Sequence, residues 1–351
     1  MTGCEITSCE KSHNELLSRC LSVDLTSANT LRLPCQAERY VVPKTLSALQ
    51  RVLREAADKQ WHITLMGGGS NVLLPAQLKG IAIRPGMQQW WLERCGESVV
   101  AHVGAGVNWH SLVMTLSARG LWGIENLALI PGDCGAAPVQ NIGAYGVELK
   151  DVLVGVQVVE LASGNVRWLS ADACQFGYRD SIFKKSLADK VVITQLTLRL
   201  SKTPQPRLGY GDLAARVAGT ANCLAVAQAV CAIRQEKLPD PQVLANAGSF
   251  FKNPLVSSDQ LSRLLQAYPD MPYFPQVNGQ SKLAAGWLID QCGLKGIRQG
   301  AFGVHARQAL VLVHFGGGDR CELLQFAEHI AHKVYDQFGV ELEPEPRLVQ
   351  A

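Results

Sequence analysis

Two glycine-rich loops constrain this chain more than any other feature of its sequence. MGGGSNVLL (66–74) follows a short strand-like run, and PGDCGAAPVQNIGAYG (131–146) contains four glycines and three alanines. Consecutive glycines can take positive φ and turn successive backbone N–H groups toward one centre, which suits an anion. Small residues also let a flat ligand lie against backbone. Together the loops predict a fold that holds a dinucleotide with a wide ring system.

Neither loop matches a common nucleotide-binding motif. The pattern G-x-G-x-x-G is missing, and no Gly-Lys-Ser/Thr follows the first loop, which excludes the Rossmann fingerprint and the P-loop. Taken alone, the first loop is more typical of a flexible turn after a strand. The presence of the second loop favours a ligand site instead. GAGVNW (104–109) is a weaker glycine pair, typical of a β-turn.

Composition narrows the classes of protein to consider. A chain of 351 residues with 47% apolar and 18% charged residues is typical of a globular protein with two or three compact units. A net charge of +3 is too small to indicate a nucleic-acid or membrane surface. The start resembles no signal peptide and no later run approaches a membrane span, so we expect a cytoplasmic enzyme.

Neither cysteines nor histidines indicate a metal or disulfide site. The eleven cysteines are scattered without a C-x-x-C pair, which favours reduced thiols. His329 and His332 stand at i, i+3, but no further ligands are near them in sequence, so we expect solvent-facing helix residues and no metal.

Periodicity predicts mixed α and β structure in three parts. The first part has an amphipathic helix in 43–60 and a strand in 62–66. The middle part has strand-like runs at 98–106, 152–161 and 190–200, for which we expect a mixed sheet with helices between. The last part has longer helices, among them 281–293 and 321–339, with Gly339 as a C-terminal cap and Pro239 and Pro241 marking its start. Residues 1–28 have no clear periodicity and are expected to be a loosely packed extension.

Seven motifs occur in an order that resembles a known enzyme family. They are GGGSN (67–71), PG-x-x-GAAP-x-QN-x-GAYG (131–146), YRDS-x-F (178–183), YGDL (210–213), KLPDP (237–241), NAGSFFKNP (246–254) and LEPEPR (342–347). In this order they closely resemble the UDP-N-acetylenolpyruvoylglucosamine reductases of bacterial peptidoglycan synthesis. YGDL resembles the form of the family that carries an extra tyrosine loop over the substrate diphosphate.

The resemblance implies a fold and a cofactor. It implies an α+β, three-domain FAD-binding fold of the vanillyl-alcohol-oxidase (PCMH) class with a C-terminal substrate-binding domain. The expected boundaries are an extension at 1–28, a first FAD-binding subdomain at 29–87 joined by 339–351, a second at 88–238, and the substrate domain at 239–338. It also implies non-covalent FAD, and NADPH that reduces the flavin and leaves before the UDP-sugar substrate enters.

The resemblance also implies the roles of individual residues. Arg179, Ser249 and Glu345 match the catalytic positions, with Ser249 as proton donor and the other two beside the substrate carboxylate. The expected substrate or nicotinamide contacts are Tyr178, Tyr210, Lys237, Asn253 and Gln308. The expected flavin contacts are Gly67, Gly68, Gly69, Ser70, Asn71, Gly132, Gly135, Ala136, Asn141, Gly143, Arg234 and Arg347.

The chemistry of an enolpyruvyl ether explains these residue types. Hydride addition at the terminal carbon pushes negative charge toward the carboxylate, and Arg179 can hold that carboxylate bidentately. An ionised Glu345 would oppose this charge, so our hypothesis is that it is protonated in the complex, with a pKa raised by burial and a nearby carboxylate. Ser249 then protonates the ether-bearing carbon, with help from neighbouring charge.

Two alternatives stay open, and three features depart from the family pattern. The alternatives are an FAD-linked oxidase, which would be supported by a flavin tethered through Cys134, and a catalytically silent nucleotide-binding relative. The departures are Asp133-Cys134 where the family usually has a small neutral pair, a chain end only four residues after Arg347, and an N-terminal extension with Cys4, Cys9 and Cys20. No exposed heptad stands out, so we expect a monomer.

Overall fold

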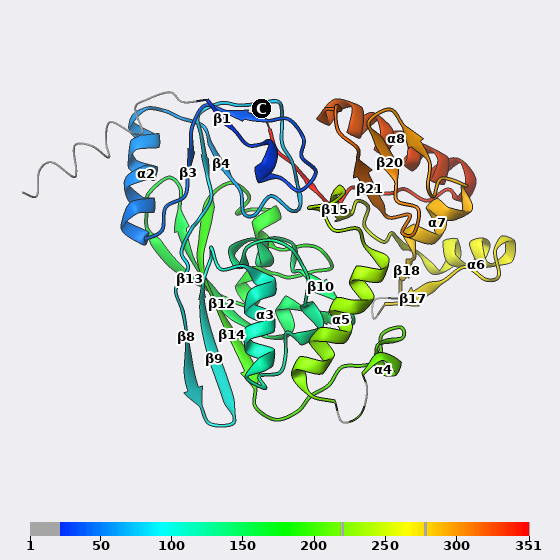
Figure 1. The fold of residues 1–351 in the computed structure, drawn as a ribbon, viewed down its shortest axis with the longest axis horizontal. Coiled ribbons are helices and arrows are strands. Elements are labelled where there is room, and N and C mark those ends of the chain that lie inside the picture. The colour runs from blue at the N-terminus through cyan, green and yellow to red at the C-terminus, as the bar shows by residue number, and fades with distance from the viewer. Residues whose placement is uncertain (1–21, 218, 220, 277–278, 351) are drawn as a thin grey trace, which may run out of the picture.

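The computed structural model describes residues 22–217, 219, 221–276 and 279–350, and Figure 1 shows three parts with sheets of their own. Helices and strands are mixed along the chain, as the predicted α+β class requires. The cysteines of the N-terminal extension lie outside the described residues. None of the helices in the described ranges has the length and apolarity needed to span a bilayer.

The first part is built on short parallel strands. Strands β3 (Tyr40–Val41), β7 (Ile81–Ile83) and β4 (Ile63–Leu65) form a parallel sheet in that order. Helix α2 (Leu46–Asp58) buries the predicted face, and the Thr45 side chain caps its N-terminus. A second sheet joins β1 (Val23–Asp24), β2 (Gln36–Ala37) and β6 (Gln77–Leu78). The carboxyl ends of β4 and β7 therefore meet at one edge, directly before the first glycine loop and Arg84.

The predicted extension is shorter than expected. Within residues 22–28, β1 pairs with β2 and Leu25 is 2% exposed, so the expectation of loose packing through residue 28 is wrong for this segment. The physical reason is that Leu25 completes a small apolar core with Cys35, Met66 and Leu74.

The middle part is a five-stranded sheet in the order β13-β12-β14-β9-β8. Its strands are β8 (Trp90–Cys95), β9 (Ser98–Gly104), β12 (Leu153–Glu160), β13 (Val166–Ser170) and β14 (Val191–Ser201). Every pairing is antiparallel, so the expected mixed sheet is wrong. Short connections such as 96–97 join neighbouring strands as hairpins, and hairpins make antiparallel pairs. Helices α3 (Trp109–Ala118) and α5 (Cys223–Lys237) cover one face of this sheet (Figure 1).

The third part packs helices against two small sheets. The larger sheet has the order β15 (Ala245–Ser249), β21 (Val311–His314), β20 (Phe302–Val304) and β19 (Arg298–Gln299). The smaller has β16 (Leu255–Val256), β18 (Ser281–Leu283) and β17 (Tyr273–Pro275). Helices α6 (Ser258–Ala267), α7 (Ala285–Gln291) and α8 (Arg320–Phe338) complete this part, and Gly339 ends α8 in the left-handed conformation as predicted.

One predicted helix in this part begins later than expected. The helix expected at 281–293 starts only at Ala285, because Ser281–Leu283 pairs with both neighbouring strands of the smaller sheet. These pairings are tertiary contacts, and they override the local helical pattern.

The chain finally returns to the first part. Strand β22 (Arg347–Leu348) pairs in parallel with β5 (Val72–Leu73), directly after the first glycine loop. The last motif of the sequence is thereby placed beside the first.

Candidate functional site

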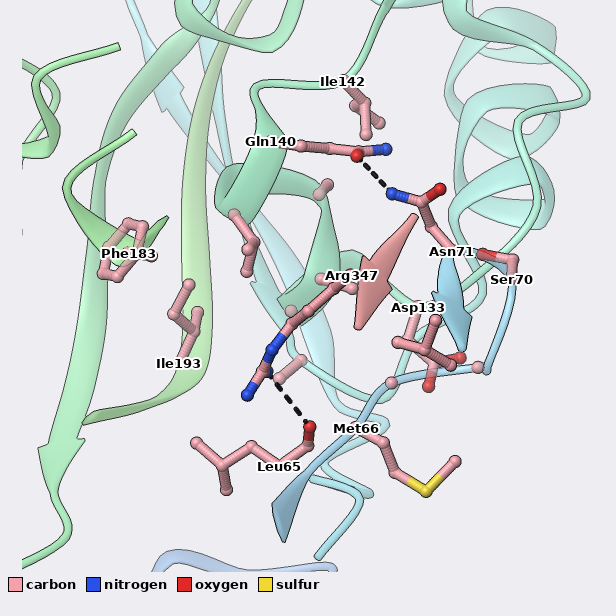
Figure 2. A pocket seen from close by; sticks show the side chains of 18 of the residues that line it. Leu65, Met66, Ser70, Asn71, Asp133, Gln140, Ile142, Phe183, Ile193 and Arg347 are labelled. Carbon is pink, nitrogen blue, oxygen red and sulfur yellow. Dashed lines mark hydrogen bonds between the residues drawn. The ribbon is translucent and has the colours of Figure 1, made fainter. Parts of the chain in front are cut away.

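The two glycine loops and the returning C-terminal strand line one large cavity. Its empty space is about 1270 Å³, a volume that includes open solvent at the mouth. Figure 2 shows Asn71 and Gln140 on one side and Arg347 reaching toward the backbone oxygen of Leu65, 3.5 Å away. The lining joins both glycine loops to Arg347, which is the arrangement that a dinucleotide site requires.

The first loop leaves its backbone donors available. Within the described ranges, no backbone N–H of residues 67–70 donates a hydrogen bond to another part of the chain. Close approach requires glycine here, since a Cβ on Gly68 would lie 3.1 Å from the Cα of Gly132. Gly67, Gly68, Gly69, Ser70 and Asn71 all line the cavity. This arrangement fits the pyrophosphate of a dinucleotide.

In the second loop, backbone N–H groups already bond to backbone carbonyls of the protein. It runs through the 3-10 helix η3 (Cys134–Gln140), where the N–H groups of Cys134 and Gly135 bond to the carbonyls of Val107 and Ala105. A Cβ on Gly135 would lie 2.6 Å from the Cβ of Ala105. The second loop therefore forms a closely packed wall of small residues, called the floor of the cavity below, whereas the first loop offers backbone N–H donors.

Four predicted cofactor contacts do not line the cavity. They are Gly132, Asn141, Gly143 and Arg234. Asn141 is fully buried, and its side chain bonds to the Glu148 carboxylate, the Gly177 carbonyl and the Lys150 N–H. The packing therefore does not favour Asn141 as a cofactor contact, and its neighbour Gln140 lines the cavity instead. Nothing in the sequence separates these two adjacent polar residues.

Arg234 and Arg347 lie in different surroundings. Arg347 lines the cavity, as expected, and also pairs with Asp189. Arg234 lies in the last turn of α5, and burial lowers the pKa of its guanidinium. Its Nε has no hydrogen-bond partner within the described residues. A buried guanidinium with an unsatisfied donor fits a position that meets an anionic or carbonyl group of a ligand.

Cys134 is not placed to tether a flavin. It is fully buried in the apolar core of the middle part and does not line the cavity. Burial raises the pKa of its thiol well above the usual range, which keeps it un-ionised and unreactive. The covalent oxidase alternative loses the residue that supported it.

A second cluster lies at one end of the cavity, where Arg179 and Glu345 meet. Arg179 Nε lies 3.2 Å from Glu345 Oε1, and Arg179 Nη2 donates to the Gly143 carbonyl at 2.7 Å. Tyr178 and Arg179 occupy the centre of a tight turn closed by Gly177 and Asp180. Arg179 has φ 54°, a left-handed conformation that is costly for arginine and often marks a functional position.

Backbone pairing brings Ser249 beside Glu345. The N–H of Glu345 donates to the Phe250 carbonyl at 2.8 Å, and Lys252 N–H donates to the Glu343 carbonyl at 2.9 Å. The segments 250–252 and 343–345 are thus adjacent, and Ser249 is the residue just before this pairing. Phe250 and Phe251 are each 1% exposed and anchor the segment in the core.

Glycine sets the direction of the Ser249 side chain. Gly248 has φ 71°, and its N–H bonds to the Asn246 side chain at 2.8 Å. The register of β15 against β21 shifts between Asn246 and Ser249, so the strand bulges there. Apart from its chain neighbours, no atom of the described residues lies within 4 Å of a Cβ built on Gly248. The backbone is therefore open to a ligand directly before the hydroxyl.

Glu345 lies among cations in a buried position. Burial raises the pKa of its carboxyl, and Arg179, Lys184 and Lys252 oppose that rise. Burial is the cause that we expected, although the neighbouring charged groups are cations. Lys184 also lines the cavity and donates to the Arg179 carbonyl at 3.1 Å. We had not assigned it, although it directly follows the YRDS-x-F motif.

Tyr178 connects this cluster to the third part. Its ring lies 4.6 Å from Lys282 Nζ, measured to the ring centroid, and burial raises the pKa of its hydroxyl. Lys282 had no sequence signal of its own, because the segment in which it lies read as helix.

The other predicted substrate contacts fall into two groups. Tyr210 is 51% exposed, its ring packs edge-on to Tyr145 at 5.6 Å, and Lys237 Nζ lies 3.8 Å from Asp212 in the same surface region. Asn253 accepts the N–H of Ala285 at the start of α7, where Gln308 also lies, 3.1 Å from a Cβ built on Gly286. The two groups come from the second and third parts of the chain.

No cluster suited to a metal ion appears. Among the described residues, no group of three or more His, Cys, Asp or Glu side chains could hold one. His329 and His332 are exposed on α8, as expected.

Comparisons with known proteins cover nearly the whole chain. Residues 37–170, which include both glycine loops, match a family described as FAD binding domain. Residues 240–349 match a family described as UDP-N-acetylenolpyruvoylglucosamine reductase, C-terminal domain.

Curated relatives and a solved structure agree with these matches. A UDP-N-acetylenolpyruvoylglucosamine reductase from Chromobacterium violaceum is 44% identical over 93% of this chain and 98% of its own length. The protein of that name from Escherichia coli is 45% identical over 92% of this chain and 94% of its own. The solved UDP-N-acetylenolpyruvylglucosamine reductase from Thermus caldophilus is 23% identical, with a TM-score of 0.65 over 95% of this chain and 99% of its own, which shows the same fold.

Proposed function

Since the chain belongs to the UDP-N-acetylenolpyruvoylglucosamine reductase family, we propose that it reduces the enolpyruvyl group of UDP-N-acetylglucosamine enolpyruvate to a lactyl ether, with NADPH as reductant. The product is UDP-N-acetylmuramate for peptidoglycan synthesis. The reaction adds one hydride and one proton across the carbon–carbon double bond, so atoms and electrons balance. The observation that carries the proposal is that Glu345, which lines the cavity, pairs with Arg179 through its side chain and with the segment that follows Ser249 through its backbone.

FAD fits the cavity, and when bound it supplies the hydride. The first glycine loop, called the donor loop below, would hold the pyrophosphate through Gly67, Gly68, Gly69 and Ser70, with Asn71 beside it. The floor of Gly135 and Ala136 lets a flat ring lie close to backbone, and Arg347 supplies a positive charge at the cavity wall. These residues would fix the position of the ligand.

Arg179 stabilises the charge that develops during the reaction. A guanidinium stays cationic and can hold a carboxylate bidentately. Its backbone turn and its bond to Gly143 hold it in place before substrate binds, so little reorganisation is needed. The gain is larger in the enolate-like state than in the ground state, which is the condition for catalysis.

Glu345 acts in its protonated form in this proposal. A carboxylic acid beside the substrate carboxylate donates a hydrogen bond, whereas an ionised one would repel it. Burial already raises the pKa of Glu345, and the substrate carboxylate would raise it further. Arg179 and Lys184 limit the rise of this pKa, so the protonation of Glu345 can change when the substrate carboxylate binds.

Ser249 donates the proton to the ether-bearing carbon. The bulge at Gly248 leaves room for the substrate next to this hydroxyl. A serine hydroxyl is a weak acid, and the cations around the adjacent Glu345, Lys184 and Lys252, would favour the alkoxide that remains after transfer. Solvent then returns the proton.

The UDP-sugar binds across the second and third parts. Tyr210 and Lys237 would meet the diphosphate, which corresponds to the tyrosine-loop form of the family. Tyr178, Asn253 and Gln308 would orient the sugar nucleotide or the nicotinamide nucleotide. We further propose that the enzyme is a cytoplasmic monomer, since its nucleotide substrates occur in the cytoplasm.

Anaerobic stopped-flow spectroscopy tests the function and the role of Ser249 together. The purified flavoprotein is reduced with NADPH, and UDP-N-acetylglucosamine enolpyruvate is then added while flavin absorbance is followed. We expect fast reoxidation in wild type. With Ser249→Ala, reduction by NADPH is unchanged and product formation falls by about 100- to 10,000-fold, the usual contribution of general acid catalysis.

The control is Ser262→Ala, which removes an exposed hydroxyl from α6 in the same part of the chain. It should leave both half-reactions unchanged. Reoxidation by air alone, with the sugar nucleotide ignored, would favour the oxidase alternative. Full product formation by Ser249→Ala would exclude this serine as the proton donor.

A further inference from the structure

An arginine–carboxylate pair lies directly beside the donor loop. Both carboxylate oxygens of Asp133 accept from Arg84, from Nε at 2.8 Å and from Nη2 at 2.9 Å. Asp133 is 5% exposed and lines the cavity, whereas the Arg84 side chain is 37% exposed. The contact is therefore bidentate and mostly shielded from water, which distinguishes it from an ordinary surface ion pair.

The carboxylate faces the part of the cavity suited to an anion. A Cβ built on Gly68 would lie 3.4 Å from Asp133 Oδ1, and one on Gly67 would lie 3.9 Å from Oδ2. Figure 2 shows Asp133 below Ser70, next to the loop. A negative charge beside the glycine loop would oppose the binding of an anion there, because shielded charges interact strongly. The site can hold an anion only if this charge is cancelled.

The pair also connects the two halves of the cavity. Arg84 directly follows β7, at the edge of the parallel sheet where the donor loop begins, and its N–H bonds to the Val41 carbonyl at 3.0 Å. Asp133 belongs to the second loop, and its neighbour Cys134 is anchored to Val107. The fork of Arg84 therefore sets the position of one loop relative to the other. Asp133 raises the pKa of Arg84 through its hydrogen bonds, so the cation persists at any physiological pH.

We propose that Arg84 is a positioning residue of the FAD site: it cancels the charge of Asp133 and holds that side chain away from the cofactor diphosphate. The inference rests on the proposed function, since it assumes FAD as the ligand. Neither residue takes part in hydride or proton transfer.

FAD titrations of the full-length protein freed of flavin test the inference, with flavin fluorescence as readout. Arg84→Met leaves a shielded carboxylate unpaired beside the diphosphate, so we expect FAD binding about 100-fold weaker than in wild type. The double variant Arg84→Met/Asp133→Asn removes the uncompensated charge and should bind FAD within about fivefold of wild type. Asp133→Asn alone should bind FAD at least as tightly as wild type, because Arg84 then offers its charge to the diphosphate.

Rescue separates charge compensation from a purely structural role. If Arg84 only stabilised the fold, the double variant would bind FAD as weakly as Arg84→Met, and that result would overturn the inference. Unchanged FAD affinity in Arg84→Met, or a loss of more than about tenfold in Asp133→Asn, would also overturn it. The latter variant keeps the test valid if Arg84→Met fails to fold.

A matched control pair lies far from the cavity. Arg167 Nε and Glu160 Oε1 are 3.1 Å apart on the five-stranded sheet and do not line the cavity. Arg167→Met and Glu160→Gln should leave FAD affinity unchanged. A wild-type protein that takes up no FAD would overturn the proposed function and this inference together, whereas unaffected Arg84→Met beside a wild type that binds FAD overturns this inference alone.

Discussion

The glycine-lined cavity and the Arg179–Glu345 cluster at its end are built in opposite ways. The cavity is lined by backbone as well as side chains: among the described residues the N–H groups of 67–70 donate no hydrogen bond, and Gly135 is closely packed. The cluster is formed by side chains from three distant segments, and its charges are buried among one another. The glycine loops of the cavity therefore depend on the absence of side-chain atoms, and the cluster depends on particular functional groups.

This difference separates binding from chemistry. A substitution at the cavity acts through steric exclusion and should change how much flavin the protein holds. A substitution in the cluster should change turnover while flavin remains bound. Two experiments test whether the two regions are independent to this degree, and a third tests the pKa of Glu345 within the cluster.

The largest effect is expected from Arg179→Met. The change removes the cation that stabilises developing charge, and losing one such group typically costs about 100- to 1,000-fold in rate. We expect kcat/KM to fall by about 1,000-fold with flavin content unchanged, measured from steady-state kinetics and the protein's flavin absorbance. Arg54→Met, on the exposed face of α2, is the control. Loss of flavin in Arg179→Met would show that the two regions are coupled.

A smaller effect, on FAD binding, is expected from Gly68→Val. A first added carbon would already lie 3.1 Å from the Gly132 backbone, and valine adds two more. We expect FAD affinity about tenfold to 100-fold lower, because the loops must move apart by a few tenths of an ångström and the donors lose alignment. Equilibrium titration with FAD measures this. Gly209→Ala meets no atom within 4 Å and should bind FAD as wild type does.

Retained turnover per bound flavin would complete the Gly68→Val test. If the few molecules that hold FAD turn over normally, the cavity affects occupancy alone. If turnover per flavin also falls strongly, the cavity and the cluster act as one unit.

The smallest effect is a change in the pH dependence of stability. Burial raises the pKa of Glu345 above its ordinary 4.5. At pH values between 4.5 and this raised pKa, the folded protein therefore binds the proton of Glu345 more tightly than the unfolded chain does. Its contribution to the free energy of unfolding therefore falls as pH rises from about 4.5 through the folded-state pKa. Glu345→Gln should remove this slope. Urea unfolding of flavin-free protein at a series of pH values measures it.

Glu341→Gln, an exposed position in the same segment, is the control for this pH series and should keep the wild-type slope. Parallel profiles for wild type and Glu345→Gln would contradict the raised pKa. The protonated role proposed for Glu345 in the substrate complex would then lose its support.

Local sequence predicted the elements that depend on near neighbours. The buried face of α8, from Leu323 to Phe338, follows directly from a 3.6-residue period, and Gly339 ends it as expected. The long strands of the middle part were equally readable. Misassignments arose where distant contacts override local preference, as in the strand Ser281–Leu283 and the packed residue Leu25.

The same limit applies to the site. The motifs identified Arg179, Ser249 and Glu345, but only the pairing of 250–252 with 343–345 brings the last two together. The sequence did not indicate that Gln140 lines the cavity while Asn141 is buried. It also did not indicate that Arg84 forms an ion pair with Asp133.

The sequence by itself determined which residue types are available for chemistry, and where glycine permits close approach, because these follow from side-chain identity and local backbone preference. Only the tertiary structure decided which charges are paired and which donors stay free. Burial and charge compensation depend on segments that lie far apart along the chain, such as 84 and 133 or 179 and 345. Local sequence carries no information on those distances.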